Sequence, residues 1–243
     1  MLVAGVDGCP FGWLAVFRST DGEPPCAQLF KSFADILKKE AAIIAVDIPI
    51  GLPTISERGG RKADRCARKM VGRRRQSSVF PTPSIATLRA KSFLQACQIE
   101  QKNSNPPKRV SQQVFNILYK IREVDAIARN IPDLIFECHP EVSFCAMNNN
   151  VAMSLPKKVS RRKDHSGLSE TGLQERCRIL IHNGYSETFA TTRIGSAKEH
   201  GRDDLIDACA AAWTAERILK GNAIRFPTEP DVDACSLDMT IWA

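Results

Sequence analysis

The sequence lacks the patterns that mark zinc-binding, secreted or membrane-spanning proteins. None of its nine cysteines forms a C-x-x-C pair, which argues against a zinc knuckle. Their odd number and scattered positions argue against a secreted disulfide framework. No apolar run approaches the roughly 20 residues of a membrane-spanning helix, and the first residues show no signal-peptide pattern. We therefore expect a soluble, cytoplasmic protein without a membrane partner.

Histidine is also scarce, and the four histidines show no metal-ligand spacing. There is no internal repeat and no low-complexity segment. The 243 residues, 43% of them hydrophobic and 25% charged, are typical of a globular chain with a sizeable core. The net charge of +7 favours an anionic partner, with nucleic acid first, although charge alone does not prove binding. The sequence leaves the oligomeric state open.

The first part of the chain predicts a β-sheet. Residues 2–7 and 12–18 are short apolar runs separated by a Gly/Pro-rich turn, and 26–30 follows a second turn signal. Three strands joined by short turns predict an antiparallel meander. Residues 41–46 form a continuous apolar run, which indicates a parallel strand buried on both faces. With a further short strand at 134–136, the pattern predicts an α/β fold.

Helices and one last strand are predicted for much of the remainder. Helical patterns cover 84–99 and 110–130, and a strong one covers 203–220. The segment 57–75 is heavily basic, with cationic residues at helical spacing. Apolar residues alternate over 237–241, which favours a final short strand.

Acidic residues stand where three of the predicted strands end. Asp7 and Asp47 close the first and fourth strands, and Glu137 follows the last of the core strands. The late helix carries Asp204 and Asp207, whose i,i+3 spacing places them on one face. In an open α/β sheet, sites form at the carboxyl ends of the strands. We therefore expect Asp7 and Asp47 to lie side by side.

Carboxylates gathered in this way repel one another, which raises their pKa values and favours a bound cation. Mg²⁺ and Mn²⁺ take oxygen ligands, and Mg²⁺ is typically held by one or two carboxylates plus substrate phosphate. Two such ions about 3.5–4 Å apart activate a water and stabilise the leaving oxygen in phosphodiester cleavage. The pattern therefore indicates a Mg²⁺ or Mn²⁺ site at this edge of the sheet.

Each acid also has a structural interpretation. Asp7 precedes a Gly-Cys-Pro turn and Asp47 precedes Ile-Pro, so either can form a turn or cap a strand. Asp204 can complement a helix N-terminus, and Glu137 can belong to a hydrogen-bond network with its sequence neighbours. Asp207 is harder to explain in this way, because it lies beside an Ala/Cys-rich face that should be buried.

The basic segment suggests contacts with phosphate. Arg65 and Arg68 lie at helical spacing between two acid-bearing strands, which favours phosphate contacts beside the metal site. The alternative is a solvated helix face. Ser77 and Ser78 follow in a loop, where they either donate to phosphate or shape the loop. For His139, next to Pro and acids, a structural role is favoured over that of a general base.

Seven segments, in order along nearly the whole chain, carry a resemblance to a known family. They are GVDGCPFGW (5–13), VDIPIGLP (46–53), DRCARKMVGRRRQSSVFPTP (64–83), SQQVFNILYKIREVD (111–125), FECHPEVSF (136–144), DDLIDACAAAWTAER (203–217) and MTIW (239–242). Through these segments the chain resembles the predicted RNase H-like nucleases grouped with RuvC and YqgF, known as domain-of-unknown-function family 429.

The resemblance implies an RNase H-like fold, a mixed five-stranded sheet with three antiparallel strands followed by parallel ones, flanked by helices. Members of the wider superfamily cut nucleic acid with carboxylate-bound Mg²⁺ or Mn²⁺. By motif, the first-strand acid falls on Asp7, the fourth-strand acid on Asp47, and the helix pair on Asp204 and Asp207. One departure is the Asn run at 148–150, where the family pattern has Asn-Gly-Gly-like residues.

We therefore predict a metal-dependent nuclease acting on DNA or RNA, built as one domain over residues 1–243 with a basic helical insertion at about 54–131. The predicted site has a catalytic set, a metal-binding subset and a substrate-binding set. The catalytic residues are Asp7, Asp47, Asp204, Asp207 and Glu137; the metal ligands for Mg²⁺ or Mn²⁺ are Asp7, Asp47 and Asp207; the substrate-binding residues are Arg65, Arg68, Ser77 and Ser78.

Two rival hypotheses remain. The first is a nucleic-acid-binding protein of the same fold that keeps the basic surface but assembles no metal site. The second is an actin-like phosphotransferase, because those folds also open with a strand, an Asp and a Gly-turn. That architecture repeats its fold and needs a second Asp/Gly phosphate loop, and the sequence shows neither.

Overall fold

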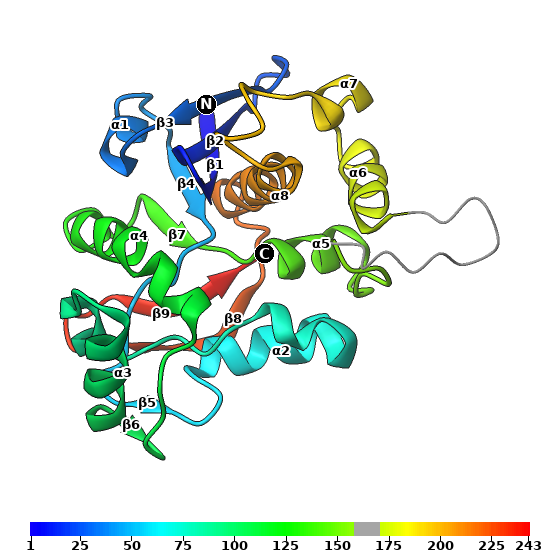
Figure 1. Cartoon of the computed structure of the whole chain (residues 1–243). Helices are drawn as coiled ribbons and strands as arrows, with labels where there is room; N and C mark the ends of the chain where they lie inside the picture. Colours follow the sequence, from blue (N-terminus) through cyan, green and yellow to red (C-terminus); the bar gives the residue numbers. More distant parts are fainter. Residues whose placement is uncertain (158–170) are drawn as a thin grey trace.

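A five-stranded mixed β-sheet forms the centre of the fold (Figure 1). The computed structural model describes residues 1–157 and 171–243. The first three strands of the sheet pair antiparallel, whereas β4 pairs parallel with β1 and β7 pairs parallel with β4. This confirms the predicted α/β fold class. The strands lie in the order β3-β2-β1-β4-β7 and comprise β1 (Leu2–Cys9), β2 (Gly12–Ser19), β3 (Cys26–Phe30), β4 (Ile43–Val46) and β7 (Ile135–Glu137).

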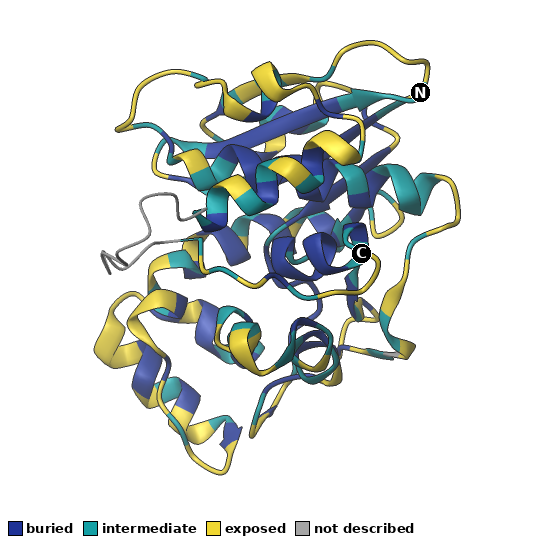
Figure 2. Cartoon of the chain, turned by 90° about the vertical axis from the view of Figure 1, so that its right-hand side faces the viewer, coloured by how far each residue is buried: buried dark blue, intermediate teal, exposed yellow. Residues whose placement is uncertain are grey.

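Helices cover both faces of the sheet. One face packs against α1 (Phe33–Leu37) and α4 (Gln112–Ala128), and the other against α5 (Pro140–Met147), α6 (Gly172–His182), α7 (Glu187–Thr191) and α8 (Arg202–Leu219). Successive side chains of a strand point to opposite faces. Trp13 and Phe17 of β2 therefore pack with α1 and α4, whereas Leu14 and Val16 pack with α8. Figure 2 shows the sheet and the inner sides of the helices buried, with the exposed residues on the outside.

The helix α8 lies against β1 at very short range because the facing residues are small. A side-chain carbon added to Gly5 would stand 1.8 Å from the backbone nitrogen of Ala212 and 2.3 Å from the carbonyl oxygen of Ala208. Such distances exclude any side chain, so this packing requires glycine in β1 and an alanine-rich face in α8. The close approach brings the first turns of α8 to the carboxyl end of β1.

Between β4 and β7 the chain forms a largely helical segment, in the range expected for the insertion at 54–131. Its elements are β5 (Ser56–Glu57), α2 (Lys62–Arg75), the 3₁₀ turns η1 (Gln76–Ser78) and η2 (Ile85–Arg89), α3 (Phe93–Lys102), β6 (Ser104–Asn105) and α4. That the whole chain is a single domain stays a prediction. Within residues 1–157 and 171–243, no helix has the length and apolar character needed to cross a membrane.

One local prediction is wrong, and three strands are absent from the predictions: the two-residue strands β5 and β6, and the longer strand β8. The single helix expected over 84–99 is two elements, η2 and α3, because the backbone is extended at Ala90 and the Ser92 hydroxyl starts a new helix by accepting a hydrogen bond from the Gln95 nitrogen. The last strand is present as β9 (Asp238–Trp242) and pairs antiparallel with β8 (Arg225–Val232). Two prolines in β8 hide its strand character in the sequence.

Candidate active site

Asp7 lies near the carboxyl end of β1, which continues to Cys9, and Asp47 directly follows the neighbouring parallel strand β4. In the pairing of β1 with β4, Val6 stands opposite Val46, so the acid that follows each valine is at the same edge. The backbone nitrogen of Asp47 donates a hydrogen bond to the Val6 carbonyl oxygen at 3.1 Å. The Oδ1 of Asp7 accepts one from the Gly8 nitrogen at 2.7 Å, which is a turn contact. The structure thus brings the two strand acids together, as expected.

The two acids of α8 approach the same place in different ways. Asp207 is buried and its charge acts on Asp7. Asp204 stands in the first turn, where its Oδ2 accepts a hydrogen bond from the Gly201 nitrogen at 2.7 Å. Asp204 therefore makes the helix-terminal contact that the sequence offered as its structural interpretation, while its charge still acts on Asp7. We call Asp7, Asp47 and Asp207 the acidic cluster.

Burial raises the pKa values of all three carboxyl groups in the acidic cluster. For Asp7, burial raises the pKa well above its usual range, and the charges of Asp207 and Asp47 raise it further. Burial likewise raises the pKa of Asp47. Burial raises the pKa of Asp207 to about 6, although the charge of Lys157 opposes the rise. These groups retain protons at pH values where exposed aspartates have lost them, so they are poised to exchange protons for a cation.

Two cationic side chains reach this region from distant parts of the sequence. The Nζ of Lys157 contacts both carboxylate oxygens of Asp207 at 2.5 Å and lies 3.6 Å from the Oε1 of Glu141. The fully buried Arg176 binds Glu141 through two hydrogen bonds, Nε to Oε1 at 2.9 Å and Nη2 to Oε2 at 2.6 Å. Burial raises the pKa of Glu141, but these hydrogen bonds and the Lys157 charge outweigh it and leave the pKa below its usual value.

Glu137 does not join the acidic cluster. Its two oxygens accept hydrogen bonds from the Nη2 and Nη1 of Arg61 at 2.5 and 2.7 Å, and Oε2 also accepts one from the Ile50 nitrogen at 2.7 Å. The Nη2 of Arg61 also donates to the Oδ1 of Asp64 at 2.9 Å. We call Arg61, Asp64 and Glu137 the Arg61 network. These contacts are those of a structural network, and a catalytic role for Glu137 stays a prediction.

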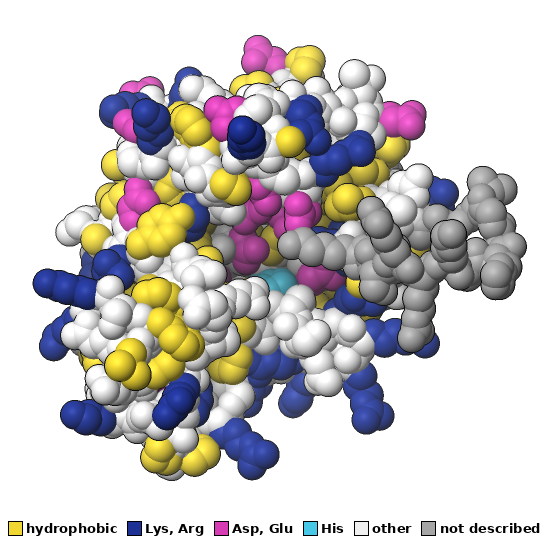
Figure 3. Space-filling view, viewed as in Figure 1, with side chains coloured by type: hydrophobic (Ala, Val, Ile, Leu, Met, Phe, Trp, Pro, Cys, Tyr) yellow, Lys and Arg dark blue, Asp and Glu magenta, His cyan; other side chains and the backbone are white. Residues whose placement is uncertain are grey.

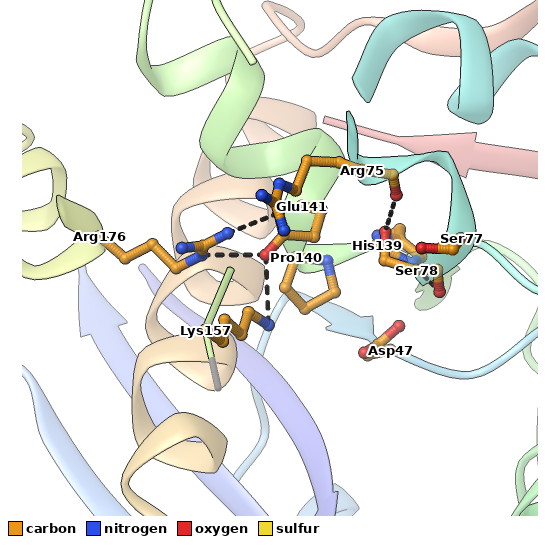
Figure 4. A pocket seen from close by; sticks show the side chains of 9 residues that line it. All are labelled: Asp47, Arg75, Ser77, Ser78, His139, Pro140, Glu141, Lys157 and Arg176. Atoms are coloured by element: carbon orange, nitrogen blue, oxygen red, sulfur yellow. Dashed lines mark hydrogen bonds and ion pairs between the residues drawn. The ribbon is translucent and has the colours of Figure 1, made fainter. Parts of the chain in front are cut away.

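A pocket of about 430 Å³ opens beside the acidic cluster. Figure 3 shows acidic side chains gathered around a histidine at the centre of one face of the molecule. The residues lining the pocket come from five separate parts of the chain, and Figure 4 shows that they surround one space. The lining residues are Asp47, Arg75, Ser77, Ser78, His139, Pro140, Glu141, Lys157 and Arg176. The pocket therefore combines one strand acid with serines and several cations.

Two of the four predicted phosphate-binding residues line this pocket, and the other two contact the loop before α2. Ser77 and Ser78 line the pocket, and the Ser78 hydroxyl donates to the Arg75 carbonyl oxygen at 2.8 Å. Arg65 and Arg68 do not line it. Each donates to a carbonyl oxygen of the loop before α2, both at 2.5 Å, and so holds that loop in place. The cation of α2 that reaches the pocket is Arg75.

A kink in α2 sets the direction of its last turn, which carries Arg75. Gly72 has φ 69° and ψ 172°, a backbone conformation that favours glycine and lies outside the helical region. No atom lies within 4 Å of a side-chain carbon built on Gly72, so conformation rather than packing requires the glycine. Beyond the kink, the Nη2 of Arg75 donates to the Ser154 carbonyl oxygen at 3.2 Å, close in sequence to Lys157.

His139 lines the pocket from the N-terminus of α5. Its Nε2 lies 3.3 Å from the Ser78 carbonyl oxygen, which can only accept, so in the neutral ring Nε2 carries the hydrogen and Nδ1 the lone pair. Among the described residues, Nδ1 is buried without a hydrogen-bond partner. His139 thus has a structural contact through one nitrogen and an unused acceptor at the other.

The sequence gives no sign that Lys157 and Arg176 belong to the site. Lys157 lies in a polar, basic stretch of the kind that usually faces solvent, and Arg176 lies within a helix whose pattern is amphipathic. Neither has an acidic partner at helical spacing, because their partners are Asp207 and Glu141. Only the folded chain reveals these pairs.

The carboxylates suit a hard divalent cation, although they form no ready-made metal-binding group. In the described part of the chain, no three His, Cys, Asp or Glu side chains are grouped so that they could hold a metal ion. Both oxygens of Asp207 are engaged by Lys157, whereas Asp7 and Asp47 have no ion-pair partner among the described residues. Two carboxylates with substrate oxygens are a common environment for Mg²⁺. Asp7 and Asp47 are therefore the two carboxylates of the acidic cluster that remain available to hold such an ion.

Comparison with known proteins relates the chain to one family. A family model described as "Protein of unknown function (DUF429)" matches residues 5–232. No curated protein and no solved structure matches the chain significantly. The match gives a relationship without an activity, so a functional proposal depends on the site itself.

Proposed function

The chain belongs to the DUF429 family, and we propose that this member is a metal-dependent nuclease that hydrolyses phosphodiester bonds in DNA or RNA. The observation that carries the proposal is the convergence of Asp7, Asp47 and Asp207 at the carboxyl edge of the mixed sheet. The RNase H-like resemblance implies acids at this edge, and their raised pKa values make them receptive to a cation.

In this proposal, the acidic cluster holds the metal ion and the pocket holds the phosphate. Asp7 and Asp47 would bind Mg²⁺ or Mn²⁺, with Asp207 beside them. When bound, the ion would activate a water molecule and offset charge on the phosphate. The Arg75 guanidinium and the Ser77 hydroxyl would donate hydrogen bonds to the non-bridging phosphate oxygens.

Exposed cations on α2 offer contacts for the remainder of the nucleic acid. They are Lys62, Lys69, Arg73 and Arg74. In Figure 3, dark blue Lys and Arg side chains gather over the region of α2, below the acidic side chains. Contacts of this kind bind the phosphate backbone without reading sequence, and they make affinity depend on salt. A surface that extends beyond the pocket favours a polymer over a single nucleotide as the substrate.

The test is a cleavage screen over single-stranded DNA, duplex DNA, branched DNA and RNA, each with Mg²⁺ or Mn²⁺. We expect at least one substrate to be cut, and we expect chelation of the metal or the Asp7→Asn substitution to abolish cutting. The matched control is Asp203→Asn, which changes an acid of the first turn of α8 outside the acidic cluster. Unchanged cleavage by a clean preparation of Asp7→Asn would contradict the mechanism.

A second candidate function is nucleic-acid binding without cleavage. Two observations favour it: Lys157 already neutralises Asp207, and the described residues contain no three-ligand metal group. In this case the protein would bind oligonucleotides equally well with and without a chelator, and it would bind no Mn²⁺. The same screen, run beside a Mn²⁺-binding measurement, separates the two functions.

A further inference from the structure

An anchored stretch of chain places Lys157 at the acidic cluster. Just before it, the backbone nitrogens of Ser154 and Leu155 donate to the Glu175 carboxylate at 2.7 and 2.9 Å. The Leu155 carbonyl oxygen accepts a hydrogen bond from the Nη1 of Arg176 at 3.1 Å. Residues of helix α6 thus fix the backbone two residues before Lys157 and help to place its side chain.

The Lys157 ammonium lies between the carboxylates of Asp207 and Glu141. It contacts both oxygens of Asp207 and lies 3.6 Å from Glu141, and its side chain is only 20% exposed. The charges of Asp207 and Glu141 raise the pKa of Lys157 above its usual value, even though burial opposes the rise. An ammonium carries three N–H donors, so the contacts with Asp207 leave one donor for Glu141 or for a phosphate oxygen.

The charges around the acidic cluster balance when one further divalent cation is added. Four carboxylates at this place face two cationic side chains: Asp7, Asp47, Glu141 and Asp207 against Lys157 and Arg176. At the rim, Asp204 and Lys120 act on one another and leave this balance unchanged. Arg75 also lines the pocket, but the proposed function assigns its charge to the phosphate, so it is not counted here. With His139 counted as neutral, two negative charges remain. They match a single divalent ion, whereas a second ion would leave an excess of positive charge.

We propose that Lys157 takes the place of a second divalent cation, so that the site binds one Mg²⁺ or Mn²⁺ at Asp7 and Asp47 while the ammonium serves Asp207. This inference rests on the proposed function, because it concerns the same site. In two-metal phosphodiester cleavage the second ion offsets charge that develops on the reacting oxygens. The lysine supplies that positive charge here, and Asp207 is the residue that positions it.

The stoichiometry of Mn²⁺ binding tests this inference without any measurement of activity. Titration followed by electron paramagnetic resonance counts the bound ions, and it also distinguishes an isolated Mn²⁺ from a spin-coupled pair. For the wild-type chain we expect one bound ion with the spectrum of an isolated Mn²⁺. Two ions in the wild-type site would overturn the role of Lys157 and leave a metal-dependent nuclease intact. No bound ion would overturn both proposals.

Variants of Lys157 give the second arm of the test. In Lys157→Gln the Asp207 carboxylate is released, so we expect a second Mn²⁺ to bind and a spin-coupled pair to appear. Lys157→Arg keeps the charge and should keep one ion. The matched control is Lys62→Gln, which removes an exposed lysine paired with Asp231 and should also keep one ion. Circular dichroism establishes whether each variant is folded. If Lys157→Gln does not fold, the number of Mn²⁺ ions bound by the wild-type chain, counted by electron paramagnetic resonance, is the deciding measurement.

One outcome would overturn the lysine's role even though the site binds metal. If Lys157→Gln binds a single isolated Mn²⁺ with the wild-type affinity, Asp207 is not freed for a second ion, and Lys157 does not stand in for one. A second ion in Lys157→Gln, absent from Lys157→Arg, supports the proposal.

Discussion

Two of the buried groups of charged side chains in the described part of the chain differ in how their charges are paired. In the Arg61 network, one guanidinium is enclosed by two carboxylates and two backbone carbonyl oxygens, and each charge has a partner. In the acidic cluster, Asp207 is paired with Lys157, whereas Asp7 and Asp47 have no ion-pair partner among the described residues. Both groups lie at the same edge of the sheet, since Glu137 ends β7 and Asp7 lies in β1.

The difference in charge pairing indicates that the Arg61 network stabilises the fold, whereas the acidic cluster is suited to binding a cation. A buried charge is tolerated when hydrogen bonds and an opposite charge surround it, and its removal then exposes its partners to an apolar environment. A buried carboxylate without such a partner weakens the folded state and gains by taking up a cation. The Arg61 network therefore holds the loop after β4 against β7. The acidic cluster, in contrast, has an excess of negative charge. Substitutions in the two groups should have effects of opposite sign on stability.

The largest effect is expected in the Arg61 network. Arg61→Met leaves Glu137 and Asp64 buried without their counter-ion, so we expect a loss of about 3–5 kcal/mol in the free energy of unfolding. Urea denaturation measures it. Lys62→Met is the matched control, because it removes an exposed ion pair with Asp231 and should cost about 1 kcal/mol or less. A loss of under about 1 kcal/mol for Arg61→Met would contradict a structural role for the network.

The next effect is a pH dependence of the metal-free protein. The pKa of Asp207 is about 6 in the folded chain, against an ordinary value of 3.8. The folded state therefore binds this proton more tightly, so its contribution to stability is complete below about pH 4 and disappears as the pH rises through 6. The difference corresponds to about 3 kcal/mol at neutral pH.

Unfolding free energies measured from pH 4 to pH 8 test this expectation. We expect the wild-type protein to lose stability over this range, and Asp207→Asn to lose less. Addition of Mn²⁺ should restore part of the loss at pH 8, because a bound cation replaces protons. Equal pH profiles for the wild-type protein and Asp207→Asn would show that this carboxyl group does not titrate in the folded state as described.

A smaller effect of opposite sign to that in the Arg61 network is expected for Asp7. Asp7→Asn removes an unpaired buried charge, so we expect the metal-free protein to become more stable by about 0.5–2 kcal/mol while Mn²⁺ binding is lost. Thermal unfolding with and without Mn²⁺ measures both changes. If Asp7→Asn instead lowers the unfolding temperature of the metal-free protein, the repulsion within the acidic cluster is not a source of instability.

The smallest effect concerns the exposed cations of α2, which neither group contains. Arg74→Ala should weaken nucleic-acid binding by a few-fold for all sequences, and the slope of log affinity against log salt should fall by about one. The control is Lys220→Ala, at the C-terminal end of α8 and paired with Glu216. If Arg74→Ala leaves the salt dependence of binding unchanged, Arg74 of α2 does not contact the nucleic acid.

The sequence predicted the carboxyl edge of the sheet because local patterns carry that information. Strand period and length place Asp7 and Asp47 at strand ends, and the parallel pairing then brings them together. The spacing of Asp204 and Asp207 predicts one helix face, but it does not say which of the two reaches the cluster. Their different environments follow from the approach of α8 to β1, which depends on Gly5 and the alanines of the helix.

The remainder of the site depends on contacts between distant segments, which periodicity does not encode. Arg65 and Arg68 have the predicted helical spacing, yet they bind loop carbonyl oxygens, and Arg75 alone of the three lines the pocket because Gly72 changes the direction of α2. Lys157 and its partners lie in stretches with no pattern of their own. The charge balance of the site therefore depends on the fold and could not be predicted from the sequence.

The packing of β1 against α8 also sets the order in which the site can be completed during synthesis. Asp7 and Asp207 lie two hundred residues apart in the chain, and a ribosome that adds about 5–20 residues per second takes roughly 10–40 s to travel between them. Until α8 emerges, the glycine-bearing face of β1 has no helix to cover it and Lys157 has no Asp207 to bind. In the proposed nuclease, this delay would keep the growing chain inert beside the RNA from which it is translated.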